Sequence, residues 1–113
     1  MIIHPDKALF AQANSLPAIP VCEHYAGSER LISKSFELQN EFGPIFDITC
    51  DLEDGAAAGD ERRHATMVVD MLRSDANRFK QAGVRIHGPE SGVWEAELDV
   101  VLTGVGDVVA YIT

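Results

Sequence analysis

Apolar and polar residues alternate one by one over residues 45–54, which is the pattern of a strand with two different faces. The apolar positions of this segment are Phe46, Ile48, Cys50 and Leu52. Its polar positions are Asp47, Thr49, Asp51 and Glu53. Strands are also indicated over residues 84–87 and 107–112 and, less regularly, over 18–21, where Pro17 and Pro20 interrupt a short apolar run.

Segments with helical spacing separate these strands or precede them. Helices are expected over residues 5–13, 28–41, 60–79 and 94–102. Ser28 and Asp60 can cap two of these helices, and Gly104 is expected to end the last one. Strands that alternate with helices are typical of βαβ units, so the chain is expected to form an α/β fold with about four parallel strands.

The length and the last predicted strand bear on domain organisation. A chain of 113 residues with 46% hydrophobic residues has room for one globular domain or part of one. No helix follows the last predicted strand. An uncovered sheet edge promotes association with other chains. We therefore expect residues 1–113 to be part of a longer domain.

Charge narrows the classes of partner. Eighteen acidic residues against nine Lys and Arg give a net charge of −9, which disfavours nucleic acids and anionic membrane surfaces. No apolar run approaches the roughly 20 residues that span a bilayer, and the N-terminus has no signal-peptide pattern. Cys22 and Cys50 are isolated, as in proteins of a reducing compartment. The sequence therefore predicts a cytoplasmic protein.

Candidate chemistry lies on the polar face of residues 45–54. In a barrel, alternate strand residues point inward, and polar side chains at the carboxyl end of a strand line the mouth. Asp51 and Glu53 are expected to point toward this mouth, with Asp54 in the loop just above. Arg85 and His87 share one face of the next strand. We therefore expect carboxylates at one strand end to face a guanidinium at the next.

Two interpretations of this arrangement are equally supported by the spacing alone. In the first, Arg85 binds a substrate carboxylate with its planar fork, and the nearby acids hold a metal-bound water, orient Arg85 or transfer protons. In the second, the charges form a salt bridge between strands that only supports the sheet.

A family resemblance favours the first interpretation. The segment Asp51-Leu52-Glu53-Asp54-Gly55-Ala56, with Asp60-Glu61 after it, resembles the D-L-E-D-(A/S)-V-x-x-x-D-K signature of the HpcH/HpaI aldolase and citrate lyase β subunit family, which includes malyl-CoA lyase-like proteins. Residues 84–87 are similar to the V-R-(I/V)-N strand of that family, residues 94–98 to its aromatic-E-x-D-L stretch, and residues 107–112 to its following strand.

The resemblance implies a fold and an activity. The family forms (β/α)₈ TIM barrels, usually trimeric or hexameric, and these proteins cleave or form C–C bonds in small 3-hydroxy or oxo acids or their CoA thioesters. Mg²⁺ stabilises the enolate in this chemistry. Residues 1–113 would be the N-terminal part of such a barrel. The implied partners are a small carboxylate or acyl-CoA substrate and further copies of the same protein.

The resemblance also implies residue roles. Arg85 would bind the substrate carboxylate or carbonyl and, with Asp54, belong to the catalytic residues. Glu53 would contact substrate, and Glu53 and Asp54 would lie beside Mg²⁺ without binding it directly. Two histidines are expected to contact substrate because of their positions and not because of the resemblance: His87 shares a face with Arg85, and His24 is expected to line the mouth beyond the first strand. The direct metal ligands of the family, a Glu and an Asp, are expected beyond Thr113, so the 113-residue chain alone is expected to be inactive.

Several positions depart from the family pattern. The Arg that usually enters the first strand is missing from residues 17–23. Gly55 replaces Ala or Ser, Glu61 replaces Lys, and His87 replaces Asn. These differences indicate a divergent subfamily and leave open the substrate and the use of a CoA thioester.

Other interpretations have less support. Cys22-Glu23-His24 is a weak metal or nucleophile motif, because neighbouring side chains on a strand diverge and no second pair accompanies them. A receiver-like signalling module needs a late Lys, whereas the last Lys here is Lys80. A non-catalytic α/β interaction fragment remains a second possibility.

Overall fold

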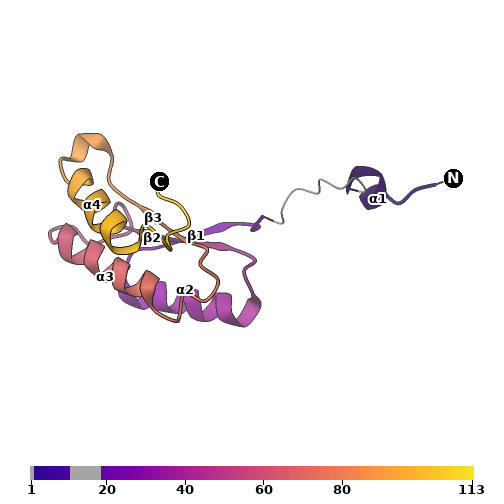
Figure 1. The fold of residues 1–113 in the computed structure, drawn as a ribbon, viewed down its shortest axis with the longest axis horizontal. Helices are drawn as coiled ribbons and strands as arrows, with labels where there is room; N and C mark the ends of the chain where they lie inside the picture. The colour runs from indigo at the N-terminus through magenta and orange to yellow at the C-terminus, as the bar shows by residue number, and fades with distance from the viewer. Residues whose placement is uncertain (1, 11–18) are drawn as a thin grey trace.

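The structure is a computed structural model that describes residues 2–10 and 19–113. Its elements in chain order are α1 (Pro5–Phe10), β1 (Glu23–Ala26), α2 (Glu29–Phe42), β2 (Asp47–Asp51), α3 (Glu61–Arg73), β3 (Ala82–Arg85), the 3₁₀ turn η1 (Pro89–Ser91) and α4 (Trp94–Val105). The helices α2 and α3 lie side by side next to the sheet, and α4 lies beside α3 (Figure 1).

The sheet is parallel, with strand order β1-β2-β3. Its register places Glu23 beside Asp47 and Asp51 beside Arg85. Residues 110–113 continue the sheet beyond β3, because Val84 N donates to Tyr111 O at 3.0 Å and Thr113 N donates to Val84 O at 2.9 Å. The expected α/β fold class is confirmed: three strands and the paired segment 110–113 run parallel, in agreement with the expected number of about four parallel strands.

The hydrophobic core lies between one face of this sheet and the helices. The strands contribute Ala26, Ile48, Cys50 and Val84, all fully buried. The helices contribute Ile32, Phe36, Ala65, Val68, Leu72, Val101 and Val105. Burial raises the pKa of the Cys50 thiol to about 12, so this cysteine behaves as a small apolar side chain. The opposite face carries the polar side chains of β1, β2 and β3.

The first strand was predicted too early in the chain. The structure forms β1 at residues 23–26, whereas the prediction was 18–21. Ala18 lies outside the described residues, and Ile19 and Val21 are exposed. The prediction followed the apolar run, but β1 itself reads Glu-His-Tyr-Ala and is barely apolar. Pro20 has no N–H for a strand ladder, which explains why regular pairing begins after it.

Helix ends also differ from the prediction. α3 stops at Arg73 and does not reach Phe79, because the amide of Asn77 donates to Leu72 O at 2.8 Å and the backbone is extended at Ser74. Gly104 does not end α4 but lies within it. A Cβ at Gly104 would stand 2.5 Å from Val69 of α3, so this glycine permits close helix packing.

Two smaller differences complete the comparison. β3 covers residues 82–85 and not 84–87, and the pairing of the last segment begins at Ala110 and not Asp107. The predicted helix over residues 5–13 is described as α1 over Pro5–Phe10, and its remaining part, residues 11–13, lies outside the described residues. Within the described part of the chain, no helix has the length and apolar character needed to cross a membrane.

Gly83 is predicted to be needed for the packing of the Tyr111 ring against the polar face of β3. A Cβ at this position would lie 2.2 Å from the Tyr111 ring, so Gly83→Ala is expected to lower the free energy of unfolding by about 1–3 kcal/mol, as overpacking does. Urea unfolding followed by circular dichroism measures this change.

A double-mutant cycle with Tyr111→Ala controls for the direct effect of the substitution. Without the ring, Gly83→Ala should be neutral or stabilising, because alanine is favoured over glycine inside a strand by roughly 0.5–1 kcal/mol. Equal effects of Gly83→Ala with and without the ring would contradict the close packing as the cause.

Candidate functional site

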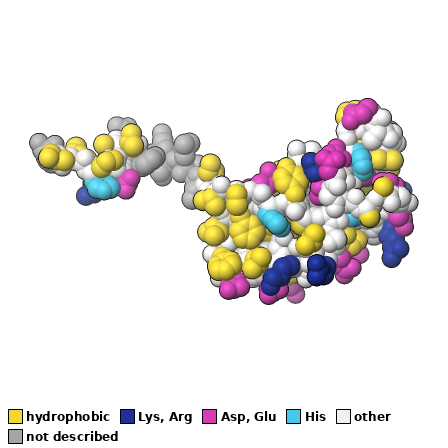
Figure 2. Space-filling model, turned by 180° about the vertical axis from the view of Figure 1, so that it is seen from behind, with side chains coloured by type: hydrophobic (Ala, Val, Ile, Leu, Met, Phe, Trp, Pro, Cys, Tyr) yellow, Lys and Arg dark blue, Asp and Glu magenta, His cyan; other side chains and the backbone are white. Residues whose placement is uncertain are grey.

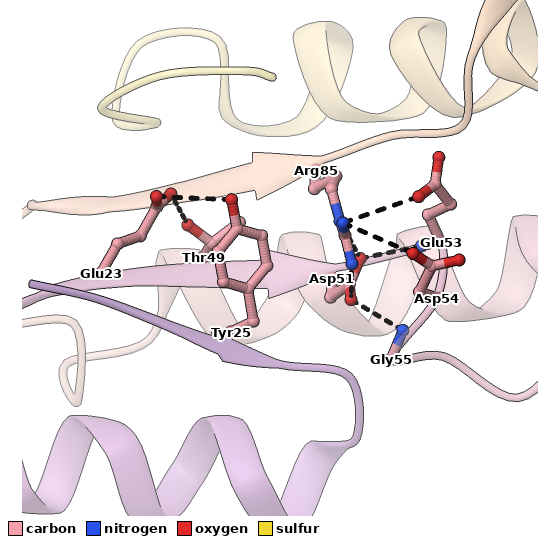
Figure 3. Close-up of polar contacts among 8 residues, drawn as sticks. All are labelled: Glu23, Tyr25, Thr49, Asp51, Glu53, Asp54, Gly55 and Arg85. Carbon is pink, nitrogen blue, oxygen red and sulfur yellow. Dashed lines mark hydrogen bonds and ion pairs between the residues drawn. The ribbon is translucent and has the colours of Figure 1, made fainter.

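Arg85 and three carboxylates meet where β2 and β3 end. The set Asp51, Glu53, Asp54 and Arg85 is called the rim cluster below, and Figure 3 shows its members pointing toward one another. Asp51 ends β2, Arg85 ends β3, and the two are direct neighbours in the register. The sequence-based expectation that carboxylates at one strand end face a guanidinium at the next is confirmed by these contacts.

Asp51 is the buried centre of the rim cluster. Its side chain is 1% exposed and accepts hydrogen bonds from Arg85 Nε at 2.8 Å and Nη2 at 2.6 Å. The backbone N–H groups of Glu53 and Gly55 donate to the same carboxylate at 3.0 and 2.7 Å. Burial alone would raise the pKa of Asp51, but these four donors outweigh it and hold the pKa below its ordinary value.

The loop after β2 is folded around this carboxylate. A Cβ on Gly55 would stand 2.5 Å from Asp51 Oδ2, so the position where the family pattern has Ala or Ser must be glycine in this conformation. A Cβ on Gly27 would in turn meet Gly55 O at 1.8 Å. The loops that follow β1 and β2 therefore touch through two glycines, which brings the two strand ends together.

Arg85 is held on two sides and open on a third. Asp51 occupies the Nε–Nη2 edge of its guanidinium, and the Tyr25 ring lies under one face at 4.7 Å. Nη1 is 3.6 Å from Glu53 Oε1 and 3.7 Å from Asp54 Oδ2. These two distances are ion pairs longer than hydrogen bonds, so the Nη1 N–H groups keep their capacity to donate. The Arg85 side chain is 27% exposed, which makes this edge accessible.

A second polar group continues down the same face of the sheet. Thr49 donates to the Glu23 carboxylate, and Tyr25 donates to Glu23 at 3.3 Å (Figure 3). The Tyr111 hydroxyl lies 2.8 Å from Thr49 Oγ1. Burial raises the pKa of Tyr111 above its ordinary value. Tyr25 joins this group to the rim cluster, because its hydroxyl contacts Glu23 while its ring contacts Arg85.

His87 does not join the rim cluster directly. Its Nδ1 lies 2.7 Å from Glu97 Oε1, and its backbone N–H donates to Glu97 Oε2 at 2.9 Å. The Glu97 side chain is 1% exposed and comes from the first turn of α4. His87 therefore fastens the end of β3 to α4, and it shares only the small pocket beside Leu52 and Glu53 with the loop after β2.

His24 lies on the opposite face of the sheet from the rim cluster, which corrects the expectation that it lines the mouth. It alternates with Glu23 and Tyr25 along β1 and lines a shallow groove with Cys22, Ser35, Leu38 and Phe46. Strand parity explains the difference, because a strand shifted from residues 18–21 to 23–26 leaves His24 within β1, not beyond its end. Hydrophobic side chains gather over the end of the sheet where β1 begins (Figure 2).

The described residues do not form a direct Mg²⁺ site. Residues 2–10 and 19–113 contain no group of three or more His, Cys, Asp or Glu side chains placed to hold a metal ion. Glu53 and Asp54 are directed toward the positively charged Arg85 Nη1, and Asp51 has its oxygens occupied by four donors. This donor set does not fit a directly bound Mg²⁺.

Comparison with solved structures identifies a citrate lyase as a relative of this chain. Over 84% of its length, this chain matches the crystal structure of a citrate lyase from Burkholderia xenovorans LB400, with 45% sequence identity and a TM-score of 0.80. The chain resembles a citrate lyase. It spans 30% of that protein's chain. No family model and no curated protein matches the sequence. The citrate lyase-like resemblance inferred from the D-L-E-D and V-R-I segments is thus supported at the level of the family, without the subfamily.

Two site residues were missed by the sequence-based reasoning. Tyr25 was missed because β1 was placed five residues too early. Glu97 was missed although a signal was present: it falls on the same helical stripe as Val101 and Val105, which are buried. An acid on an apolar stripe must find a partner inside the protein, and His87 is that partner.

Asp51→Asn is expected to destabilise the fold by about 3 kcal/mol. The NH₂ group of the new amide would face the N–H donors that now bind Asp51, and the neutral side chain would leave the Nε–Nη2 edge of Arg85 without its carboxylate. Chemical denaturation at neutral pH measures the loss. Asp107→Asn is the matched control, since Asp107 pairs with Arg73 at 2.9 Å but both side chains are exposed. That change should cost less than about 1 kcal/mol. Similar losses for both variants would contradict the special role of Asp51.

The lowered pKa of Asp51 predicts a pH dependence of stability. A carboxyl group whose folded pKa is depressed stabilises the fold above its unfolded pKa, about 3.9 for Asp, and loses this contribution as the pH falls through the folded pKa. The stability difference between the wild type and Asp51→Asn should be constant above about pH 5 and should shrink below about pH 4. A difference that does not change in acid would show that folding leaves the pKa of Asp51 unchanged and would contradict its lowering by the four donors.

Proposed function

We propose that this chain carries the substrate-anchoring part of a carbon–carbon lyase or aldolase domain of the citrate lyase type. The observation that supports this proposal best is the state of Arg85, because one edge of its guanidinium is fixed by a buried carboxylate. The other edge, Nη1, has Glu53 and Asp54 at ion-pair distances of 3.6 and 3.7 Å but makes no hydrogen bond among the described contacts, and it is called the free edge below. The 45% identity to a citrate lyase over most of the chain supports the reaction class.

The free edge suits a carboxylate group. Arg85 Nη1 can donate to an anionic oxygen, and because Asp51 and Tyr25 hold the guanidinium, little side-chain freedom remains to be lost on binding. Glu53 and Asp54 lie beside this edge and can accept a hydrogen bond from a hydroxyl group of the same ligand. The proposed ligand is therefore a small hydroxy or oxo acid, free or as its CoA thioester.

The remaining family properties belong to the proposal as well. Mg²⁺ would supply enolate stabilisation in the complete enzyme, with Glu53 and Asp54 near it and its direct ligands outside the described residues. A cytoplasmic location and a trimeric or hexameric assembly stay predictions of the sequence and its resemblance.

Replacing Arg85 by Lys tests whether the Arg85 guanidinium anchors the ligand by binding its carboxylate. 3-Hydroxybutyrate, which has one carboxylate and one hydroxyl group, is titrated into the chain and followed by NMR chemical shifts. Arg85→Lys keeps the charge but loses the fork, so the affinity should fall by about tenfold. Arg85→Ala is unsuitable, because it would leave the buried Asp51 without its cation.

Arg73→Lys is the matched control for this experiment. Arg73 also pairs with an Asp at 2.9 Å, but on an exposed surface away from β2 and β3. Its replacement should leave 3-hydroxybutyrate binding unchanged. If Arg85→Lys binds the ligand as well as the wild type does, Arg85 only supports the sheet and the anchor is wrong.

A further inference from the structure

Tyr25 and Arg85 come from strands that are not neighbours in the sheet. The strand order β1-β2-β3 places β2 between them, and adjacent strands lie about 4.8 Å apart. The two side chains nevertheless meet, with the Arg85 Cζ atom 4.7 Å from the centre of the Tyr25 ring (Figure 3). The β2 residue in register with Tyr25 is Thr49, whose side chain is short. The contact between ring and guanidinium therefore bridges β2.

The Tyr25 ring restrains a motion that Asp51 leaves open. Two hydrogen bonds to Asp51, at 2.8 and 2.6 Å, fix the position of the Nε–Nη2 edge of Arg85. Hydrogen bonds accept a broad range of out-of-plane angles at an sp² oxygen, so the guanidinium plane can still tilt about this edge. The ring blocks the tilt on its own side and attracts the cation electrostatically. The direction of the free edge thus depends on Tyr25 as well as on Asp51.

Tyr25 is itself held by polar contacts further along the same sheet face. Its hydroxyl donates to Glu23 Oε2 at 3.3 Å, and the other oxygen of Glu23 accepts from Thr49. The Tyr111 hydroxyl lies 2.8 Å from Thr49 Oγ1. Because 3.3 Å is longer than the usual O–H···O distance of about 2.7 Å, the hydroxyl holds Tyr25 less firmly than a short hydrogen bond would. Glu23 therefore supports the ring, but with a weak contact.

We propose that Tyr25 is a positioning residue for substrate binding. Its ring keeps the free edge of Arg85 directed toward the substrate carboxylate, and Glu23 supports the ring through the Tyr25 hydroxyl. The inference rests on the proposed function, in which Arg85 anchors that carboxylate. Without the ring, Arg85 has more freedom to lose when a ligand binds, and ordering one side chain lowers an affinity by roughly two- to tenfold.

Two replacements of Tyr25 separate the ring from the hydroxyl. 3-Hydroxybutyrate is titrated into each variant and followed by NMR chemical shifts. Tyr25→Leu removes the ring and should weaken binding by about fivefold, whereas Tyr25→Phe keeps the ring and should stay within about twofold of the wild type. Because Tyr25 is 43% exposed, both variants are expected to fold, which urea unfolding checks. Equal losses in the two variants would overturn the role of the ring.

A double-mutant cycle shows whether Tyr25 acts through Arg85. Lysine has no planar guanidinium for the ring to orient, so Tyr25→Leu should weaken binding by less than about twofold when Arg85 is already replaced by Lys. A loss of the same size in both backgrounds would mean that Tyr25 touches the ligand or supports the fold in general. Either result would overturn the positioning role.

A second cycle tests the part of Glu23. Glu23→Ala should weaken binding by about twofold in the wild type and should have no further effect in Tyr25→Phe, because both changes remove the same contact. Glu37→Ala is the matched control, since it removes an exposed carboxylate of α2 and should leave the affinity unchanged. A further loss from Glu23→Ala in Tyr25→Phe would show that Glu23 does not act through the hydroxyl.

The measurements distinguish failure of this inference from failure of the proposed function. If Tyr25→Leu binds 3-hydroxybutyrate as tightly as the wild type while Arg85→Lys binds it more weakly, the anchor remains and only the positioning role is wrong. If the wild type does not bind the ligand, or if Arg85→Lys binds it unchanged, the anchor is wrong and the proposed function fails with it.

Discussion

The hydrogen-bonded ion pair between Asp51 and Arg85 is the interaction on which the polar side of this fold depends. It joins the ends of two neighbouring parallel strands, and the same carboxylate orders the loop after β2 through the N–H groups of Glu53 and Gly55. A charge that is 1% exposed is tolerated only when all its lone pairs are used, and here four donors use them. The pair is therefore both the support of the loop and the reason that one edge of Arg85 is oriented outward.

The three acids of the D-L-E-D segment consequently have different roles, although they are adjacent in the sequence. The carboxylate of Asp51 is buried and accepts hydrogen bonds from four donors of the protein, so it has no acceptor site left for a ligand. Glu53 and Asp54 follow the end of the strand, lie 3.6 and 3.7 Å from Nη1, and keep their oxygens accessible. The Tyr25 ring packs against one face of the Arg85 guanidinium, and the Tyr25 hydroxyl donates a hydrogen bond to Glu23 further along the same sheet face.

Much of this site follows from strand parity. The alternation of residues 45–54 placed Asp51 on the polar face of its strand, and the alternation of residues 84–87 did the same for Arg85. The parallel register makes the two residues neighbours. The helix after β2 and its apolar stripe were also predictable, because Val68 and Leu72 repeat with helical spacing. Parity failed for β1, whose four residues contain little apolar signal, so Tyr25 was missed and His24 was expected on the wrong face. α3 ends through a local hydrogen bond from the Asn77 side chain to Leu72 O, which the helical spacing of apolar residues does not reveal. The continuation of α4 through Gly104 depends on a tertiary contact with Val69 of α3, which no local pattern encodes.

The departures from the family pattern can be separated by the same contacts. Gly55 is a packing requirement, since a Cβ would displace Asp51 from its bonds to Arg85. His87 instead contacts the buried Glu97 through its backbone N–H and its Nδ1, and these two contacts connect the segment after β3 to α4. Neither change removes the free edge of Arg85. The divergence at Gly55 and His87 therefore alters how the strand ends are held, while the group that would meet a substrate carboxylate and the two carboxylates beside it stay in place.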